Sequence, residues 1–115
     1  MNVTERFLKY VSFPTSSDEF SETVPSTAKQ KILGEYIADE LKTMGMEEVI
    51  LDDKGYVYAR LQGNLDGAIG FVAHMDTSPA VKGDGINPKV VHYDGGDIEL
   101  GAGMSLDVES FPYLN

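Results

Sequence analysis

One continuous apolar run constrains the fold of this chain more than any other feature of its sequence. The run, residues 68–73 (Ala-Ile-Gly-Phe-Val-Ala), contains no polar side chain and does not alternate between apolar and polar positions. A strand that is apolar on both sides is typical of the interior of an α/β sheet, where other layers cover both faces. We therefore expect residues 68–73 to form an interior strand with His74 at its carboxyl end.

A short helix and a loop are predicted at the start of the chain. Asn2 and Glu5 have the spacing of a capping box, and the apolar residues that follow share one helical face. We expect this helix to end before Pro14. Residues 12–25 then mix Ser, Thr, Asp and Glu with two prolines, a composition that is typical of a surface loop.

A second, longer helix is predicted after this loop. Thr27 and Gln30 again match a capping box, and Gly45 is suited to the left-handed residue that ends a helix. The intervening residues place one apolar stripe on the helix, at spacings of three and four residues. The members of this stripe are Ile32, Leu33, Tyr36, Ile37, Leu41 and Met44.

Short strands are predicted on both sides of the apolar run. Residues 49–51 and 56–61 flank a turn signal at residues 53–55 (Asp-Lys-Gly), which predicts an antiparallel hairpin. Two weaker strand patterns follow at residues 89–93 and 98–100. Together these elements predict an α/β fold in which helices pack on a mixed sheet.

The charge and the absence of cysteine exclude several classes of function. Nine Lys and Arg against 19 Asp and Glu give the 115 residues a formal net charge of −10. This excess would repel phosphate groups, which argues against nucleic acids and anionic membranes as partners. Without cysteine, a metal must be held by His, Asp or Glu. Because the first residues contain no long apolar run, we expect a cytoplasmic protein without a signal peptide or membrane span.

His74 and Asp76, in the sequence AHMDTSP, are the residues that point most strongly to chemistry. Side chains two residues apart in an extended chain point the same way, so both would project from the end of the expected strand. Ligand sites of α/β sheets tend to lie at that end, and a zinc-bound histidine usually has its other ring nitrogen held by a neighbouring group such as a carboxylate. The same pair is equally compatible with a strand-end histidine that a loop aspartate satisfies.

Other candidate sites have simpler structural explanations. His92 lies on an expected exposed strand without a partner at metal-ligand spacing. Residues 94–97 (Asp-Gly-Gly-Asp) lack the ligand ladder of a calcium loop and indicate a turn. Residues 101–103 (Gly-Ala-Gly) are not followed by the helix and third glycine of a dinucleotide site, and Ser78 lacks the G-x-S-x-G frame of a serine nucleophile.

Five segments of the sequence together resemble one known family. They are TERFLKYVSFPTSS, ETVPSTAKQ, GYVYARLQGN, IGFVAHMDTSP and YDGGDIELG, and the motif HMDTSP is the most specific element. In this order and at these separations they closely resemble the start of the peptidase T family, the bacterial aminotripeptidases. The relatives of that family are two-zinc aminopeptidases, dipeptidases and deacylases. One departure is Ala80, where family members often carry an acidic residue.

The resemblance implies an activity and a role for two residues. It implies a zinc-dependent hydrolase that removes the N-terminal residue from tripeptides, with a metal-bridging water as the nucleophile. The complete active site of such an enzyme holds two zinc ions, and its substrates are small peptides. His74 corresponds to a zinc ligand of the family, and Asp76 to the catalytic aspartate that orients and tunes the metal site.

The resemblance also implies that residues 1–115 form the N-terminal segment of a metallopeptidase catalytic domain. The remaining metal ligands and a lid domain would lie outside the chain, because a catalytic zinc normally needs three protein ligands. We therefore expect an inactive fragment with at most one partial metal site, which self-associates through uncovered apolar surface. The alternatives are a related deacylase or dipeptidase, and a module without catalytic activity.

Overall fold

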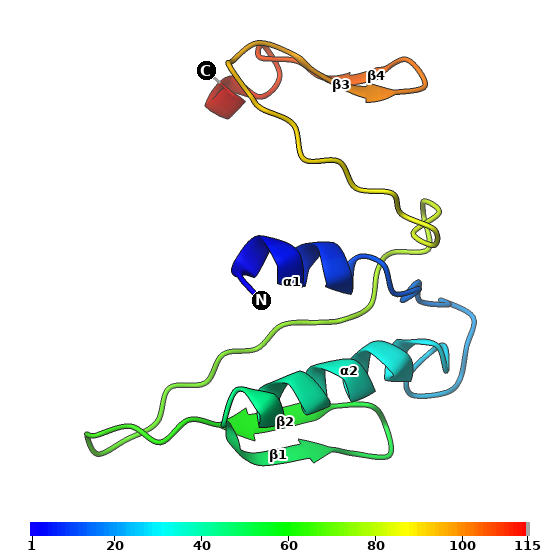
Figure 1. Cartoon of the computed structure of the whole chain (residues 1–115). Coiled ribbons are helices and arrows are strands. Elements are labelled where there is room, and N and C mark those ends of the chain that lie inside the picture. Colours follow the sequence, from blue (N-terminus) through cyan, green and yellow to red (C-terminus); the bar gives the residue numbers. More distant parts are fainter. Residues whose placement is uncertain (115) are drawn as a thin grey trace.

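The computed structural model describes residues 1–114 and contains two helices and two small antiparallel sheets (Figure 1). This mixed α/β composition confirms the predicted fold class. Within residues 1–114, no helix is both long enough and apolar enough to cross a membrane. The elements in chain order are α1 (Val3–Tyr10), α2 (Gln30–Thr43), β1 (Glu47–Leu51), β2 (Val57–Arg60), β3 (Ile98–Gly101), β4 (Met104–Leu106) and the 3₁₀ helix η1 (Pro112–Leu114).

Helix α1 begins with the capping box that the sequence predicts. The Asn2 side chain accepts a hydrogen bond from the Glu5 amide at 2.9 Å, and the Glu5 carboxylate accepts one from the Asn2 amide at 2.8 Å. Each residue thereby satisfies a backbone donor that has no partner inside the helix. The helix ends at Tyr10, before Pro14 as expected.

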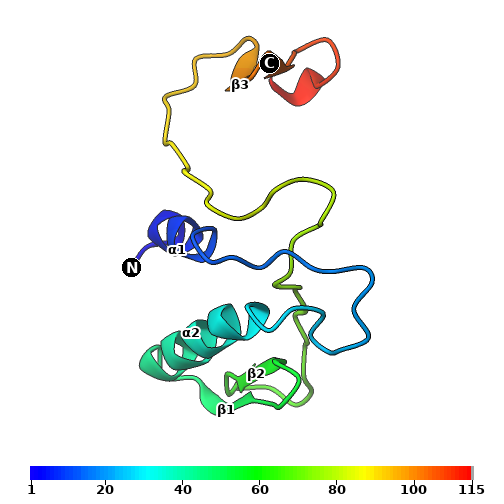
Figure 2. The same ribbon diagram turned by 90° about the vertical axis from the view of Figure 1, so that its right-hand side faces the viewer.

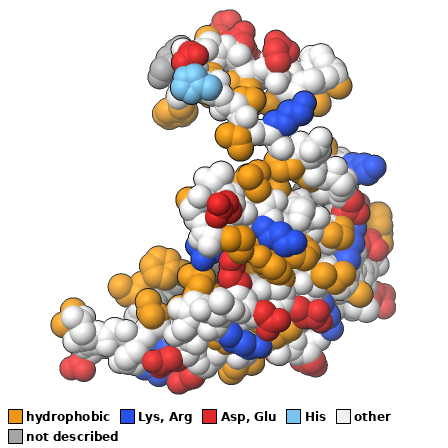
Figure 3. All heavy atoms as spheres, viewed as in Figure 1, with side chains coloured by type: hydrophobic (Ala, Val, Ile, Leu, Met, Phe, Trp, Pro, Cys, Tyr) orange, Lys and Arg blue, Asp and Glu red, His pale blue; other side chains and the backbone are white. Residues whose placement is uncertain are grey.

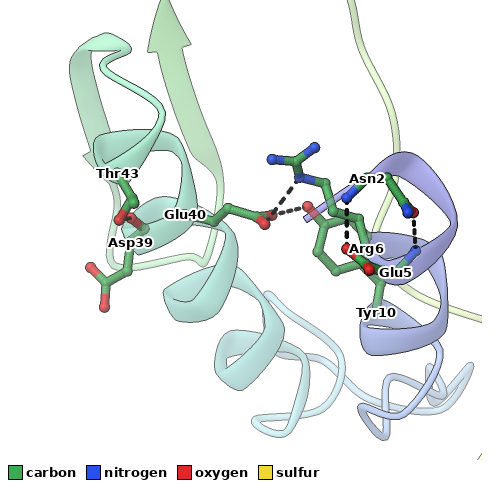
Figure 4. Close-up of polar contacts among 7 residues, drawn as sticks. All are labelled: Asn2, Glu5, Arg6, Tyr10, Asp39, Glu40 and Thr43. Carbon is green, nitrogen blue, oxygen red and sulfur yellow. Dashed lines mark hydrogen bonds and ion pairs between the residues drawn. The ribbon is translucent and has the colours of Figure 1, made fainter.

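Polar contacts, shown in Figure 4, and aromatic contacts join α1 to α2. The Glu40 carboxylate, whose side chain is only 10% exposed, accepts hydrogen bonds from Tyr10 and, at 3.1 Å, from Arg6. Burial, followed by the hydrogen bond to Glu40, raises the pKa of Tyr10 to about 12. The rings of Tyr10 and Phe13 both contact Tyr36, with centroid separations of 6.1 and 5.1 Å.

The two ends of α2 differ in how well the sequence predicts them. Thr27 does not cap the helix, because its hydroxyl donates to the Ser16 carbonyl oxygen at 2.9 Å; the helix begins later, after Lys29, without a side-chain cap. The capping-box prediction for this helix is therefore wrong. The C-terminal prediction is confirmed: Gly45 has a φ of 80°, and the amides of Gly45 and Met46 donate to carbonyls of the last turn at 3.0 Å each.

The core of the chain lies where α2 packs on the β1–β2 hairpin. The two strands pair antiparallel around the predicted turn, so the hairpin prediction is confirmed. Gly34 lies at this contact: a Cβ on this residue would lie 3.4 Å from both the Gly55 carbonyl oxygen and Leu51 Cδ1. The buried apolar side chains among residues 1–114 are Leu33 and Ala38, both on α2.

The prediction of an interior strand at residues 68–73 is wrong for this chain. The segment is extended but belongs to no strand, and Figures 1 and 2 show it as a ribbon without strand arrows, which in Figure 1 runs back from the lower left toward the helices. Phe71 is 95% exposed and Val72 is 100% exposed. An interior strand needs hydrogen-bonded neighbours and a layer on each face, and residues 1–114 place no strand beside this run.

The two later strand predictions also have different outcomes. Residues 89–93 form no strand, whereas residues 98–100 lie within β3. Strand β3 pairs with β4, across a turn at Gly101, Ala102 and Gly103 whose φ values are all positive. The sequence pattern missed β4 because its three residues are too few to show a period.

The chain as a whole is extended. Its radius of gyration is 17.8 Å, against about 13 Å for a compact chain of this length. Figure 3 shows hydrophobic side chains exposed along the arm at the lower left and across the middle of the same face. Exposed apolar surface on this scale is unusual for an isolated soluble domain.

Candidate metal centre

His74 and Asp76 contact each other directly in the structure. The distance between His74 Nδ1 and Asp76 Oδ1 is 3.1 Å, and the two side chains are 82% and 42% exposed. An ionised carboxylate can only accept hydrogen bonds, so Nδ1 is the donor of this contact. The lone pair of the neutral ring is then on Nε2, which is the atom that could bind a metal.

A short backbone bridge fixes the chain immediately after this pair. The Thr77 amide donates to the Thr15 carbonyl oxygen at 3.1 Å, and the Ser17 amide donates to the Thr77 carbonyl oxygen at 2.9 Å. The Ser17 hydroxyl adds a second hydrogen bond to the same carbonyl at 3.0 Å. The predicted surface loop at residues 12–25 is therefore anchored at its start, where Thr15 is only 4% exposed.

A largely apolar cleft of about 850 Å³ borders His74. Residues of α1, α2 and β2 line it together with residues 71–75. The imidazole of His74 thus lies between apolar surface and solvent, next to the carboxylate of Asp76.

A second His-x-Asp pair is present that the sequence analysis did not recognise. His92 Nε2 lies 2.8 Å from Asp94 Oδ1, with both side chains more than 80% exposed. His92 is exposed as expected, but it lies on no strand, and the expectation that it has no partner at metal-ligand spacing is wrong. Its spacing to Asp94, identical to that of His74 and Asp76, was the available signal. Such a contact alone does not define a metal site, because it forms here on an exposed loop.

The other acidic and glycine-rich motifs have local structural roles. Asp97 accepts a hydrogen bond from the Val108 amide at 2.9 Å, and the Tyr93 hydroxyl donates to the Gly96 carbonyl oxygen at 2.7 Å. These contacts make residues 94–97 part of a turn, as the sequence indicates. Residues 101–103 form the β3–β4 turn described above.

The His74–Asp76 pair can supply one ligand of a zinc centre, but not the complete set of ligands. Nothing but solvent covers much of His74, and its Nε2 is not used in a hydrogen bond to another described residue. Among residues 1–114, no three side chains of the types His, Cys, Asp and Glu lie close enough together to hold a metal ion. A catalytic zinc normally has three protein ligands, so a metal here would need further donors.

Comparison with known proteins gives one consistent result, although no family model matches the chain. Peptidase T of Clostridium perfringens is 51% identical over 116 aligned residues, which cover 97% of this chain. Peptidase T of Clostridium acetobutylicum is 50% identical over 97% of the chain, and that of Parabacteroides distasonis is 46% identical over 100%. The chain spans only 28–30% of the length of such relatives.

Proposed function

We propose, from the homology of this chain to peptidase T over 97% of its length, that it is the N-terminal segment of a metal-dependent aminopeptidase. The proposed reaction releases the N-terminal residue from tripeptides. The observation that carries the proposal is the direct contact of His74 Nδ1 with Asp76 at 3.1 Å, within a chain 44–51% identical to enzymes of that name.

His74 and Asp76 have separate roles in this proposal. His74 would bind zinc through Nε2, and Asp76 would hold the ring by accepting the proton of Nδ1, which fixes the tautomer and raises the basicity of Nε2. When bound, the metal supplies Lewis-acid activation of water and of the peptide carbonyl. Zinc itself is part of the proposal, since histidine and carboxylate ligands also suit cobalt and manganese.

Residues 1–115 form part of the catalytic domain in this proposal. We place the remaining metal ligands in the portion of the relatives that this chain does not span, because residues 1–114 bring no three suitable donors together. A complete site of this kind would hold two zinc ions, of which His74 would bind one.

The proposal is tested in the complete protein that carries these residues. His74→Ala should nearly abolish the release of N-terminal residues from tripeptides, with metal at saturating concentration. The matched control is His92→Ala, which removes the other His-x-Asp histidine and should leave the rate unchanged. Tripeptide hydrolysis near the unmodified rate by the His74→Ala protein would exclude His74 from the site.

A substrate panel distinguishes this activity from its alternatives. A deacylase would prefer N-acyl amino acids and a dipeptidase would prefer dipeptides, whereas the proposed enzyme should prefer tripeptides with a free amino terminus. The absence of turnover on the whole panel, with metal bound, would favour a module without catalytic activity. The similarity to three peptidase T sequences favours the tripeptide reaction.

A cytoplasmic location is also part of the proposal. The chain has no cysteine, so it does not depend on the oxidising compartments in which disulfides form. Cell fractionation that recovers the protein with secreted or membrane material would overturn this point.

A further inference from the structure

Three chain segments meet around Thr77, and we call this group the Thr77 clamp. It consists of Thr15, Ser16 and Ser17 from the first loop, Thr77 itself, and Gly83 with Asp84 from the following loop. The backbone bridge described above joins the first loop to Thr77, one residue beyond Asp76. The clamp therefore fixes the main chain directly next to the His74–Asp76 pair.

Gly83 occupies a position in the clamp that has no room for a side chain. A Cβ on Gly83 would lie 2.9 Å from Thr77 Oγ1 and 3.2 Å from Ser16 Oγ. Both distances are shorter than ordinary van der Waals contact, and the two atoms belong to the two sides of the bridge. A side chain at this position would force the Thr77 or Ser16 side chain to shift. The backbone conformation itself does not call for glycine, because φ of Gly83 is not positive.

Asp84 connects the clamp to the start of α2. Its Oδ1 accepts a hydrogen bond from the Ser16 hydroxyl at 3.2 Å, and its Oδ2 accepts one from Lys29 Nζ at 2.9 Å. The Thr27 hydroxyl donates to the Ser16 carbonyl oxygen at 2.9 Å, which ties the same loop to the same helix end. The clamp is thus attached to the most buried element of the chain.

We propose that the Thr77 clamp positions the His74–Asp76 pair, and that Gly83 and Asp84 act as positioning residues for it. The inference rests on the proposed function of that pair in metal binding. The clamp fixes the residue next to Asp76 and so limits the positions from which the Asp76 carboxylate contacts the His74 ring. The His92–Asp94 pair has the same spacing without such a clamp, and there both side chains are more than 80% exposed, whereas Asp76 is 42% exposed.

The first test compares Gly83→Ala with Gly63→Ala in the 115-residue chain. A Cβ on Gly63 would meet no neighbouring atom within 4 Å, and its φ is not positive, so Gly63 is a matched control for the added methyl group. Nitrogen-15 spectra of the histidine rings report the fraction of the Nδ1–H tautomer of His74, and amide exchange reports the clamp. Gly83→Ala should lower that tautomer fraction and speed exchange at the Thr77 and Ser17 amides about tenfold or more. Gly63→Ala should change neither.

The second test removes the carboxylate of the clamp. Asp84→Ala should produce the same two changes, whereas Asp39→Ala should not, because Asp39 forms a comparable ion pair with Lys42 away from the clamp. The His92 ring is an internal control, and its spectrum should stay constant in every variant. Exchange in the β1–β2 hairpin should also stay constant, which shows that the helix–hairpin unit remains folded.

A suppressor variant separates positioning from general damage. Thr77→Ala in the Gly83→Ala background removes the closest atom of the clash while it keeps both backbone hydrogen bonds. This double variant should restore the tautomer fraction of His74. An unchanged His74 spectrum in both Gly83→Ala and Asp84→Ala, with the clamp amides exchanging faster, would overturn the inference. None of these readouts depends on catalysis, so they stand apart from the activity test of the proposed function.

Discussion

Asp76 contacts Nδ1 of His74 and leaves Nε2 available to a ligand, whereas Asp94 contacts Nε2 of His92. The Nδ1–Oδ1 contact of 3.1 Å selects one of the two neutral tautomers of His74. A group that contacts a metal ligand, and not the metal, influences both the orientation of that ligand and its basicity.

We therefore expect Asp76→Ala to weaken zinc binding about 10- to 100-fold in the complete protein. Competition titration with a metal indicator measures this change. Asp94→Ala is the matched control, because it removes the carboxylate of the other His-x-Asp pair and should leave the zinc affinity unchanged. Equal losses for the two variants would contradict a specific role of Asp76.

Asp84 makes the Thr77 clamp sensitive to acid. The hydrogen bond from Lys29 is the main cause that lowers the pKa of this carboxyl below 3.8, and Ser16 and the charge of Lys82 act in the same direction. A carboxyl group whose pKa is lower in the folded state than in the unfolded state stabilises the folded state when the pH is above the unfolded-state pKa. This stabilisation is lost as the pH falls through the folded-state pKa. Slow exchange of the Thr77 amide should thus persist at pH 4 and be lost only at lower pH. Loss of protection between pH 6 and 5 would contradict this assignment.

At the scale of elements, the contact of α1 with α2 depends on a tyrosine that donates to a largely buried carboxylate, that of Glu40. Tyr10→Phe removes this hydrogen bond to Glu40 and should lower the free energy of unfolding by about 0.5–1.5 kcal/mol. Urea denaturation followed by circular dichroism measures the change.

Because the pKa of Tyr10 is raised from 10.0 to about 12, the neutral form of its side chain is favoured in the folded state. The difference between the two proteins should be complete below pH 10 and disappear as the pH rises to about 12.

The packing of α2 on its hairpin depends on the size of residue 34. A Cβ at Gly34 would make ordinary contacts of 3.4 Å with the Gly55 carbonyl oxygen and Leu51. Gly34→Ala should therefore stabilise the chain by about 0.5–1 kcal/mol, since glycine is unfavourable inside a helix. Gly34→Leu should instead destabilise it by about 1–3 kcal/mol, because the longer side chain has no space against the hairpin. Thermal denaturation of the two variants gives the comparison, and equal shifts would exclude this packing.

The elements that the sequence predicts correctly are those whose contacts lie within a few residues. The Asn2–Glu5 capping box, the glycine that ends α2 and the turn of the β1–β2 hairpin all depend on adjacent positions. Thr27 has the spacing of a helix cap, but its hydroxyl donates a hydrogen bond to the Ser16 carbonyl oxygen, 11 residues away in the sequence. The clamp around Thr77 has no sequence signal at all, because it joins residues that are about 60 positions apart.

At the scale of the whole molecule, the apolar run at residues 68–73 leaves large hydrophobic side chains exposed. Its composition is that of a buried strand, yet Phe71 and Val72 are almost completely exposed. We propose that this surface makes the isolated chain self-associate, because exposed apolar side chains and unpaired strand edges promote association.

Val72→Asp tests this proposal. A carboxylate on a fully exposed residue should change the free energy of unfolding by less than about 0.5 kcal/mol, and it should reduce self-association in sedimentation experiments. Glu22→Ala, in the first loop, is the control and should change neither quantity. A loss of several kcal/mol on Val72→Asp would show that residues 68–73 are buried in the solution state of the chain.

The parallel bridge between the first loop and Thr77 has a consequence for the order in which the chain folds. The hydrogen bond from Ser17 to Thr77 closes a loop of 60 residues, which carries an entropic cost of about 4 kcal/mol if the intervening chain is unstructured. Helix α2 and its hairpin lie inside that loop and form from near neighbours. Once they fold, fewer residues of the loop remain flexible, so the remaining entropic cost is smaller. The His74–Asp76 pair is therefore assembled late, on a helix–hairpin unit that is already in place.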